Sequence, residues 1–404
     1  MSERVKLASD YSARYSQGHL DSYLKPYHRP ESESLAGDIL SVDLRRMSEI
    51  LKEATRQVVA GDPQMVLEPA DVMISYEASP KERNDLISEG LQLINRGKAA
   101  VVTMAGGQGS RLGHNGPKGT FVLPLKEPKS LFRIQCEGLI KVGMQAGKML
   151  PWFIMTSHDN HDATVSYFVD NDFLGYDRSL VRFFPQNEVP VVDREGRLLV
   201  RNNRIVRAAD GNGGIFAALA SSGNIKVLEE HGVERVFICG IDNALIQMAD
   251  PLFLGFSAKT GKPIASKSVL KRSFDENAGV FCRKNGRPYY IEYTEIPEEK
   301  ARMTDSSGQL VFGDAGIVAY VYDTKLLRRL ADKPLPYHPA HKKIAYSLPD
   351  GTPVDPDQPN AIKFESFIFD SFEYADDVAV MRVDRKKEFA PIKKIGRASC
   401  RERV

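Results

Sequence analysis

The residues best suited to chemistry lie in one glycine-rich stretch, VVTMAGGQGSRLGHNGPKGT, at 101–120. Four of its glycines follow the first apolar run closely: Gly106, Gly107, Gly109 and Gly113. Glycines let a backbone approach an anion closely and present successive N–H groups to it. Arg111 and Lys118 add positive charge in the same stretch. The pattern therefore predicts a loop that binds a polyphosphate.

Two commoner phosphate loops do not fit this stretch. A dinucleotide fingerprint needs a glycine where the chain has Leu112. A Walker A loop needs Ser or Thr after its lysine, whereas Lys118 stands between Pro117 and Gly119. The sequence thus favours nucleotide binding of another kind.

Short apolar runs separated by helical stretches surround the loop. The runs are AAVVTM (99–104), PWFIMT (151–156), VRFF (181–184) and VFICG (236–240). They are too short for helices and too continuously apolar for half-exposed strands, so they predict buried strands of an α/β sheet. Helices are expected at 130–146, with Ser130 as N-cap, and at 215–230. Later segments predict added strands: IASKSVL, RPYYIEYTEI, QLVF and GIVAYVYD.

The first 95 residues predict a helical region. An amphipathic helix is expected from Leu44 to Val58, and a capping box of Ser79, Pro80 and Glu82 opens another that ends before Gly97. The expected domains are 1–95, a catalytic domain at 96–394, and a tail at 395–404. The segment 334–360, rich in proline and aspartate, is expected to be an irregular connection.

Composition excludes several classes. With 404 residues, 42% hydrophobic and 27% charged, the chain is neither disordered nor a disulfide mini-protein. A net charge of +2 indicates no nucleic-acid or membrane surface. The four cysteines form no CxxC pair, so neither a zinc site nor a disulfide framework is predicted. With no apolar leader visible, we expect a cytoplasmic location.

The last ten residues, IGRASCRERV, resemble a translated sequencing adapter. We therefore expect them to be foreign to the protein and the natural chain to continue past Lys394. The tail holds three arginines and one glutamate, so it accounts for the whole net charge of +2 and leaves 52 basic and 52 acidic residues.

The loop AGGQGSRLG with PKG resembles the signature of the eukaryotic UDP-sugar pyrophosphorylase family, and of its UDP-N-acetylhexosamine pyrophosphorylase branch. Further matching segments follow in order: KSLFRIQCEGL, FFPQNEVP, ADGNGGIFAAL, IDNALIQMADPLFLGF, IEYTEI, AIKFESFIFDSF and EFAPIK. ADGNGG matters most, because the UDP-glucose branch carries a histidine-rich turn there. The resemblance implies an α/β fold, a Rossmann-like nucleotidyltransferase (GT-A-like) mixed sheet flanked by helices, without the family's C-terminal β domain.

The resemblance also implies a reaction. UTP and a sugar 1-phosphate would give a UDP-sugar and pyrophosphate, with Mg²⁺ as cofactor and neither nucleic acid nor membrane as partner. The residues matched to phosphate-facing, catalytic positions are Arg111, Lys118, Lys271 and Lys393. Those matched to nucleotide binding are Ala105, Gly106, Gly107, Gly109, Gln186 and Gly211. Those matched to the sugar are Asn212, Gly279, Glu292, Phe367 and Phe369, and Asp242 matches the metal-linked aspartate.

Plain structural alternatives stay open for these residues. Asp242 could be a turn residue, Gly211 and Asn212 a tight turn, and the lysines solvated. Phe367 and Phe369 are expected on one face of a strand, where such a pair is more often core. Glu292 and Glu295, three apart on a strand, are expected on opposite faces and so form no dyad.

Two further patterns carry no site in this interpretation. The pairs His158/His161 and His338/His341 have metal-compatible spacing but lack a third ligand. The basic run 385–387 is flanked by Asp384 and Glu388 and predicts a solvated face.

One segment departs from the branch. Where relatives read NAGNI, this chain reads VFGDAGIVAY (311–320), which puts Gly313 and Gly316 at the asparagine positions. Loss of those amides would relax or shift sugar choice. The alternatives are therefore a UDP-sugar pyrophosphorylase of different or broader specificity, such as for glucose, and a non-catalytic nucleotide-sugar binding protein.

Overall fold

The computed structural model describes residues 2–25, 30–57 and 65–393. Contacts divide the chain into two compact units. The N-terminal unit comprises Met1–Pro63, Asn187–Gly214 and Leu335–Ile368, and the sheet unit comprises Gln64–Gln186, Ile215–Pro334 and Phe369–Val404. Val58 and the tail at 395–404 lie outside the described residues.

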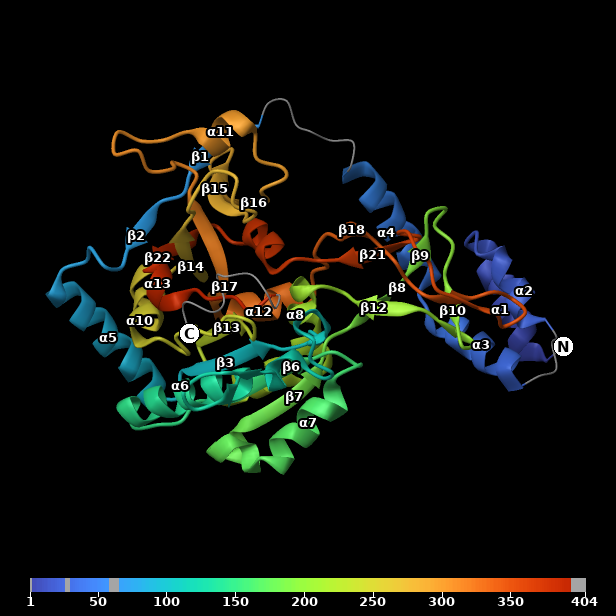
Figure 1. The fold of residues 1–404 in the computed structure, drawn as a ribbon, viewed down its shortest axis with the longest axis horizontal. Helices are drawn as coiled ribbons and strands as arrows, with labels where there is room; N and C mark the ends of the chain where they lie inside the picture. The colour runs from blue at the N-terminus through green and yellow to red at the C-terminus, as the bar shows by residue number, and fades with distance from the viewer. Residues whose placement is uncertain (1, 26–29, 58–64, 394–404) are drawn as a thin grey trace. The chain divides into compact units, whose positions relative to one another are not determined.

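The sheet unit is built on a mixed sheet that confirms the predicted α/β class (Figure 1). Across the described residues the strand order is β2-β22-β14-β17-β13-β3-β6-β7, with β1, β15 and β16 attached beside this path. The strands are β1 Leu67–Pro69, β2 Val72–Ile74, β3 Ala99–Met104, β6 Trp152–Thr156, β7 Val181–Pro185, β13 Arg235–Gly240, β14 Ile264–Leu270, β15 Val280–Lys284, β16 Arg287–Ile291, β17 Asp314–Asp323 and β22 Val378–Arg382. A short hairpin of β4 Val122–Leu123 and β5 Lys129–Ser130 lies apart from it.

Strand direction decides where the connecting loops gather. β13, β3, β6 and β7 are parallel neighbours, and their last residues are in register, as in the pair of Gly240 with Met104. β17 is antiparallel to both β13 and β14, so β14 and its parallel neighbour β22 run the same way as β13. The segments that follow β3, β6, β7, β13, β14 and β22 therefore all leave from one edge of the sheet, which is where open α/β sheets bind ligands.

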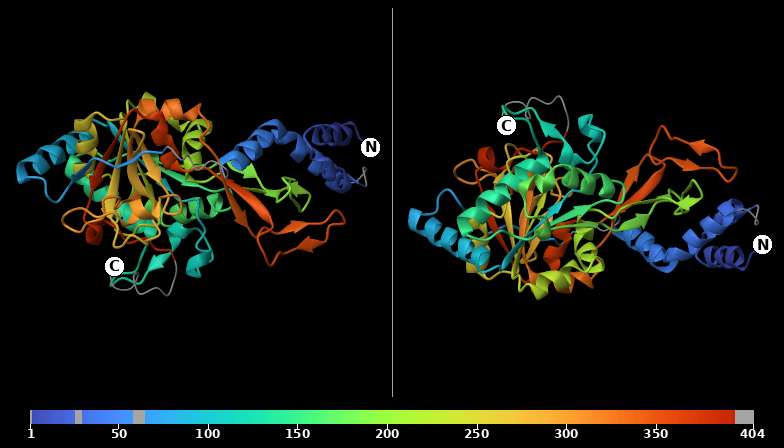
Figure 2. Two further views of the ribbon diagram at one scale, coloured as in Figure 1. Left: turned by 90° about the horizontal axis from the view of Figure 1, so that it is seen from above. Right: turned by 90° about the horizontal axis from the view of Figure 1, so that it is seen from below.

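Helices lie on both faces of this sheet (Figure 2). They are α5 Pro80–Asn95, α6 Leu131–Ala146, α7 His161–Asp170, α8 Ile215–Ser221, α9 Asn224–Glu230, α10 Pro251–Thr260, α11 Glu298–Arg302, α12 Thr324–Ala331 and α13 Arg385–Glu388. Both predicted caps are present, since Ser79 Oγ accepts from Glu82 N and Ser130 Oγ accepts from Arg133 N. None of the helices in the described ranges is both long and apolar enough to cross a membrane.

The structure corrects a predicted helix and a predicted strand of this unit. The helix expected over 215–230 is broken into α8 and α9, because Gly223 adopts a left-handed conformation with φ +74° that ends the first helix. The segment QLVF forms no strand, and only Leu310 makes an isolated bridge, to Thr304. Its apolar residues serve burial instead, since Phe312 belongs to a small cluster with Leu67.

The N-terminal unit combines the predicted helices with two later β excursions. Its helices are α1 Glu3–Arg14, α2 Asp21–Leu24, α3 Pro30–Ser41 and α4 Leu44–Gln57. Its strands are β8 Glu188–Pro190, β9 Val192–Asp193, β10 Val200–Arg201, β11 Arg204–Ile205, β12 Arg207–Ala209, β18 His338–Lys342, β19 Tyr346–Ser347, β20 Pro353–Val354 and β21 Ala361–Glu365. Leu44, Met47 and Ile50 of α4 enter one core with Val192 and Phe364.

The connection expected over 334–360 is therefore not wholly irregular. β18 pairs with β21, β21 pairs with β9, and β19 pairs with β20. Strands so short carry little sequence signal of their own, and pairing with distant partners defines them.

A buried ion triad joins distant parts of the sheet unit. Lys267 on β14 is completely buried, and its Nζ lies 2.7 Å from an Asp250 carboxylate oxygen and 2.5 Å from one of Glu388. Burial opposes the charge of Lys267, but the two carboxylates outweigh it and raise the pKa of the lysine. The triad thus links β14, the start of α10 and the end of α13.

Replacing Lys267 with Met should destabilise the protein by about 3–5 kcal/mol, because two partly buried carboxylates lose their counter-charge. Lys226→Met is the control, since Lys226 forms an exposed pair with Glu230 that contributes less than about 1 kcal/mol. Urea unfolding measures both. Equal midpoints for the two variants would contradict the prediction.

Candidate nucleotide-binding and catalytic site

The glycine-rich loop leaves the end of β3 and closes on itself. Gly109 N donates to Gly116 O at 2.9 Å, and Lys118 N donates to Gly107 O at 3.0 Å. Gln108 and Pro117 form an antiparallel bridge between these bonds. The loop is therefore a tight hairpin-like turn of backbone, which keeps its remaining N–H groups in fixed directions, as an anion-binding loop requires.

Asn160, which the sequence reasoning missed, holds this loop through hydrogen bonds to its backbone. Its buried Nδ2 donates to Ala105 O at 2.9 Å and Gly107 O at 3.3 Å, while its Oδ1 accepts from Ser157 N at 2.8 Å. The amide thus joins the loop after β3 to the turn after β6. The only sequence signal was an asparagine shortly after a predicted strand, and a local motif does not reveal such a long-range contact.

Gln186 lies beside the loop at the end of β7. It is buried, and its N–H donates to Thr156 O at 2.8 Å. A Cβ on Gly106 would lie 2.4 Å from the Gln186 Oε1, so only glycine permits this approach. The structure therefore brings Gln186 together with Gly106, two of the residues predicted to bind the nucleotide.

Lys118 and Asp242 meet at the same edge of the sheet. The Lys118 Nζ lies 3.6 Å from the Asp242 Oδ2, and both side chains are partly exposed. Asp242 lies at the carboxyl end of β13, as predicted, with Ile241 between it and the strand. Arg111 is exposed on the 3-10 turn Ser110–Leu112 of the glycine-rich loop. The edge thus places the carboxylate of Asp242 close to the cationic groups of the glycine-rich loop.

This donor set fits Mg²⁺ carried by phosphates. Mg²⁺ commonly takes one or two protein carboxylates together with water and substrate phosphates. Asp242 supplies one carboxylate, 31% exposed, and no group of three or more His, Cys, Asp or Glu side chains that could hold a metal occurs in the part of the chain that the structure describes. His161 instead hydrogen-bonds Thr156 through Nδ1 at 2.8 Å.

Lys271 and Lys393 differ in their surroundings. Lys271 follows β14 and is 7% exposed, so it is not a solvated surface lysine. Its Nζ donates to Phe274 O at 3.1 Å, and burial lowers the pKa of its ammonium although Glu276 and Asp275 oppose the shift. Lys393 is exposed and follows Ile392, whose N–H donates to Asp242 O at 2.8 Å.

Three predicted sugar-side residues of the sheet unit surround Tyr290, which was not predicted. The Phe369 ring stacks on the Tyr290 ring with centroids 4.6 Å apart. A Cβ on Gly279 would lie 2.4 Å from the Tyr290 ring, and the charge of Glu292 adds to burial in raising the pKa of Tyr290. A Cβ on Gly316 would lie 3.0 Å from the same ring. Tyr290 therefore fills the space beside Gly316, one of the two glycines that stand where relatives have asparagine.

The strand expected over Glu292 and Glu295 is wrong. β16 ends at Ile291, and Glu295 N donates to Glu292 O at 2.9 Å within a turn. The argument from opposite strand faces therefore does not apply to this pair.

In the N-terminal unit, Gly211 and Asn212 belong to a turn held by the segment after β21. Gly213 N donates to Ser366 O at 2.9 Å, and Asn212 Oδ1 accepts from Ile368 N at 2.9 Å. Gly211 has φ +88°, and a Cβ there would lie 2.3 Å from Ser366 O. The tight turn is real, and the acceptor of Asn212 is committed to the backbone.

Phe367 and Phe369 do not share a strand face, which corrects the prediction. β21 ends at Glu365, Phe367 follows in an irregular segment, and Phe369 lies in the 3-10 helix Ile368–Tyr374. The Phe367 ring lies 4.9 Å from the His338 ring.

Asp210, next to the same turn, is another residue that the sequence reasoning missed. It is 3% exposed, and its Oδ1 has no hydrogen-bond partner among the described residues. A Cβ on Gly214 would lie about 2 Å from the carboxylate, so the glycine makes room for it. Burial raises the pKa of Asp210 to about 7, with Lys363 opposing and Glu188 supporting the shift.

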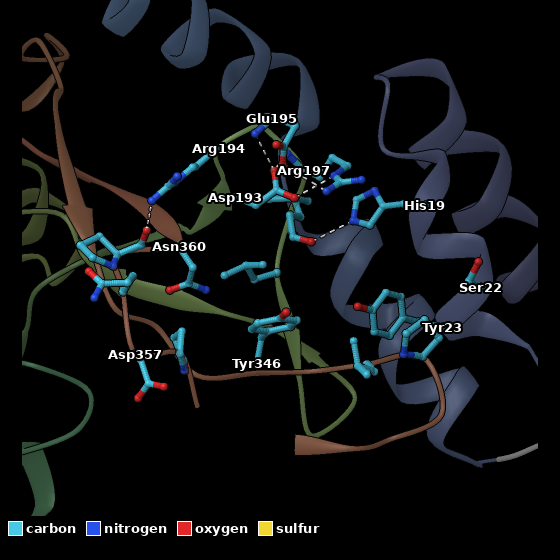
Figure 3. Close-up of a pocket in the computed structure, with 17 residues that line it drawn as sticks. His19, Ser22, Tyr23, Asp193, Arg194, Glu195, Arg197, Tyr346, Asp357 and Asn360 are labelled. Carbon is cyan, nitrogen blue, oxygen red and sulfur yellow. Dashed lines mark hydrogen bonds and ion pairs between the residues drawn. The ribbon is translucent and has the colours of Figure 1, made fainter. Parts of the chain in front are cut away.

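The N-terminal unit also holds a pocket of about 740 Å³ away from that turn (Figure 3). Figure 3 shows His19 and Tyr23 from the helical side facing a hollow that Asp193, Arg197 and Asn360 also border. Arg197 is paired with Asp193 at 2.7 Å. None of the predicted site residues lines this pocket.

Comparison with known proteins agrees on one family. The sequence model described as "UTP--glucose-1-phosphate uridylyltransferase" matches residues 45–398. "UDP-N-acetylglucosamine pyrophosphorylase" of Saccharomyces cerevisiae is 38% identical over 79% of this chain and 70% of its own length. "UDP-N-acetylhexosamine pyrophosphorylase-like protein 1" of Homo sapiens is 34% identical over 81% and 66% respectively. The uridine diphosphate N-acetylglucosamine pyrophosphorylase of Trypanosoma brucei has a crystal structure that superposes with a TM-score of 0.84 at 29% identity, covering 99% of this chain and 83% of that one.

The burial of Asp210 predicts a pH dependence of stability. Its pKa is about 7 in the folded protein and about 3.8 otherwise. Between those pH values the unfolded chain releases a proton that the folded protein keeps, so stability falls as pH rises. Asp210→Asn removes this loss, which amounts to at most about 4 kcal/mol above pH 7. Urea unfolding at pH 4.5 and pH 8 measures it; parallel profiles for the two proteins would contradict the assignment.

Proposed function

The chain belongs to the UTP–glucose-1-phosphate uridylyltransferase family, and we propose that it transfers the uridylyl group of UTP to an N-acetylhexosamine 1-phosphate. The products are UDP-N-acetylglucosamine or UDP-N-acetylgalactosamine and pyrophosphate. The observation that carries the proposal is the closed glycine-rich loop with Lys118 beside Asp242 at one sheet edge. The names and identities of the relatives support the hexosamine as acceptor.

The chemistry needs alignment and charge neutralisation more than a base. A sugar 1-phosphate is already an anionic oxygen nucleophile, since the second pKa of a phosphate monoester is about 6. In-line attack on the α-phosphorus of UTP brings two anions together and releases pyrophosphate. The protein must therefore hold both substrates in line and offset negative charge on the phosphoryl oxygens.

The cationic residues at the sheet edge suit these tasks. Arg111 and Lys118 lie on the loop that would hold the β- and γ-phosphates, so they would stabilise departing pyrophosphate. Lys271 and Lys393 would face the reacting phosphates. Members of this family generally use a divalent metal, and Asp242 is the carboxylate that would hold Mg²⁺. When bound, Mg²⁺ would offset the negative charge of the phosphate oxygens.

The remaining predicted residues would select the base and the sugar. Gln186 and Gly107 would receive the uracil, and Gly211 matches a further uracil-binding position of the family. Phe369 and Tyr290 offer a stacked aromatic surface for the acetamido group, and Glu292 would accept from a sugar hydroxyl. Asn212, whose Oδ1 accepts from Ile368 N, would donate to the sugar through its Nδ2.

The runner-up is a UDP-sugar pyrophosphorylase of different or broader sugar choice. It rests on Gly313 and Gly316, which lack the amides found in the branch. A non-catalytic nucleotide-sugar binding protein is disfavoured, because sugar binding alone would not need the cations on the pyrophosphate side. We further propose a cytoplasmic enzyme, in keeping with Cys136, Cys239 and Cys282, which are buried and form no disulfide within the described ranges.

A panel of sugar 1-phosphates tests the proposal directly. With UTP and Mg²⁺, the protein should release pyrophosphate, and N-acetylglucosamine or N-acetylgalactosamine 1-phosphate should give a higher kcat/KM than glucose 1-phosphate. A preference for glucose 1-phosphate would favour the runner-up. No pyrophosphate with any sugar, from protein that binds UTP, would favour the binding protein.

Arg111→Ala should lower kcat by more than about tenfold, because the protein loses one preorganised positive charge that faces the departing pyrophosphate. Its control is Arg287→Ala, an exposed arginine on β16 that is not among the predicted site residues. Pyrophosphate release under saturating UTP measures both variants. Wild-type kcat in Arg111→Ala would remove this residue from the mechanism.

A further inference from the structure

The segment that carries Lys393 is paired with the residues after β13. Ile392 N donates to Asp242 O at 2.8 Å, and Ala244 N donates to Ala390 O at 3.2 Å. Between these bonds Asn243 and Pro391 form an antiparallel bridge. Lys393 is thus one residue away from a hydrogen bond to the backbone of the predicted metal-linked aspartate.

This pairing is too short to be held by its ladder alone. It spans three residues on each side, and Pro391 has no N–H to donate. Two-stranded pairings are marginally stable in water even when they are longer. Something besides the backbone must therefore hold the segment in place.

Burial of Ile392 in the hydrophobic core of the sheet unit supplies part of that hold, and the Asn243 side chain supplies the polar part. It is 4% exposed, its Nδ2 donates to Glu388 O at 2.7 Å, and its Oδ1 accepts from Ala390 N at 2.9 Å. The same Oδ1 accepts from Leu245 N at 3.2 Å, within its own turn. An amide combines donor and acceptor, whereas a carboxylate accepts only and a hydroxyl is shorter.

The start of the segment is anchored separately. The Glu388 carboxylate pairs with the buried Lys267, and Arg385 pairs with Glu276 and donates to Leu270 O at 3.0 Å. These contacts fix α13, and the Arg385 guanidinium also lies 5.2 Å from the centre of the Phe389 ring, but they do not reach the residues from Ala390 onward. Asn243 is the buried side chain that joins the fixed end of the segment to the turn of Asp242.

We propose that Asn243 is a positioning residue for the phosphate site: its amide locks the segment 388–392 onto the turn after β13 and so sets the place of Lys393 relative to Asp242. This inference rests on the proposed function, which makes Lys393 and Asp242 phosphate-facing groups. Asn243 itself need not touch substrate.

A double-mutant cycle on the 404-residue chain tests the proposal. Asn243→Ala, Lys393→Ala and the double variant are compared for UTP affinity by calorimetry with EDTA present, and for kcat and KM with Mg²⁺. Asn243→Ala should lower turnover by about 10-fold to 100-fold, because a displaced charge loses alignment. In the Lys393→Ala background the same substitution should add little to either loss, because the group that it positions is already gone.

Asn224→Ala is the matched control. Asn224, the first residue of α9, is also a buried asparagine of the sheet unit. Its Oδ1 accepts from Arg182 Nε at 3.0 Å. Its replacement should lower the melting temperature comparably but leave UTP affinity unchanged. If Asn243→Ala does not fold, Asn243→Asp, which keeps the shape and the acceptor but loses the donor to Glu388 O, is carried through the same cycle.

The outcomes separate this inference from the proposed function. With an active wild type, losses of UTP affinity that add up independently in Asn243→Ala and Lys393→Ala would overturn the positioning role. An equal loss of UTP affinity in Asn224→Ala would overturn it as well. A wild type that binds UTP without turnover would overturn the proposed function, and the cycle in UTP affinity would still decide the role of Asn243. A wild type that does not bind UTP would overturn both.

Discussion

The common direction of six strands is the constraint on which the sheet unit's candidate site depends. β3, β6, β7, β13, β14 and β22 run the same way, although antiparallel β17 stands between β13 and β14. Because their carboxyl ends meet at one edge, residues that are far apart in sequence gather there. Gly106 approaches Gln186, and Lys118 approaches Asp242, as consequences of this register. Without it, each motif would be an isolated turn.

Asparagine amides hold the turns that this register brings together. Asn160 joins the glycine-rich loop to the turn after β6, and Asn243 joins the segment of Lys393 to the turn of Asp242. In the N-terminal unit Asn212 binds the backbone of Ile368 in a similar way. Turns expose backbone groups that no ladder satisfies, and an amide can both donate to and accept from them. Loop geometry therefore depends on a few polar side chains.

Charge in this protein is organised locally. The chain is nearly neutral as a whole, yet Arg111, Lys118 and Asp242 come from the loops at one sheet edge, where phosphates would bind. Elsewhere the same physics serves stability. Lys267 remains charged in the interior because two carboxylates face it. The charge of Lys363 does not outweigh the burial of Asp210, so the pKa of Asp210 rises to about 7.

The sequence alone determined the elements with strong local signals and the family. Continuous apolar runs marked β3, β6, β7 and β13, and Ser79 and Ser130 marked two helix starts, because burial and capping depend on nearby residues. The glycine-rich loop pointed to a phosphate site for the same reason. The single helix expected over 215–230 was wrong, since Gly223 interrupts it.

Contacts between distant segments were decided only by the tertiary structure. The strand placement of Phe367, Phe369 and Glu292 was wrong, because tertiary pairing ends β21 and β16 earlier than the apolar pattern suggests. For Tyr290, Asn160, Asn243 and Asp210, no local signal revealed the contacts that these residues make. Their surroundings come from residues far along the chain, and burial, pairing and desolvation exist only once those segments have been brought together.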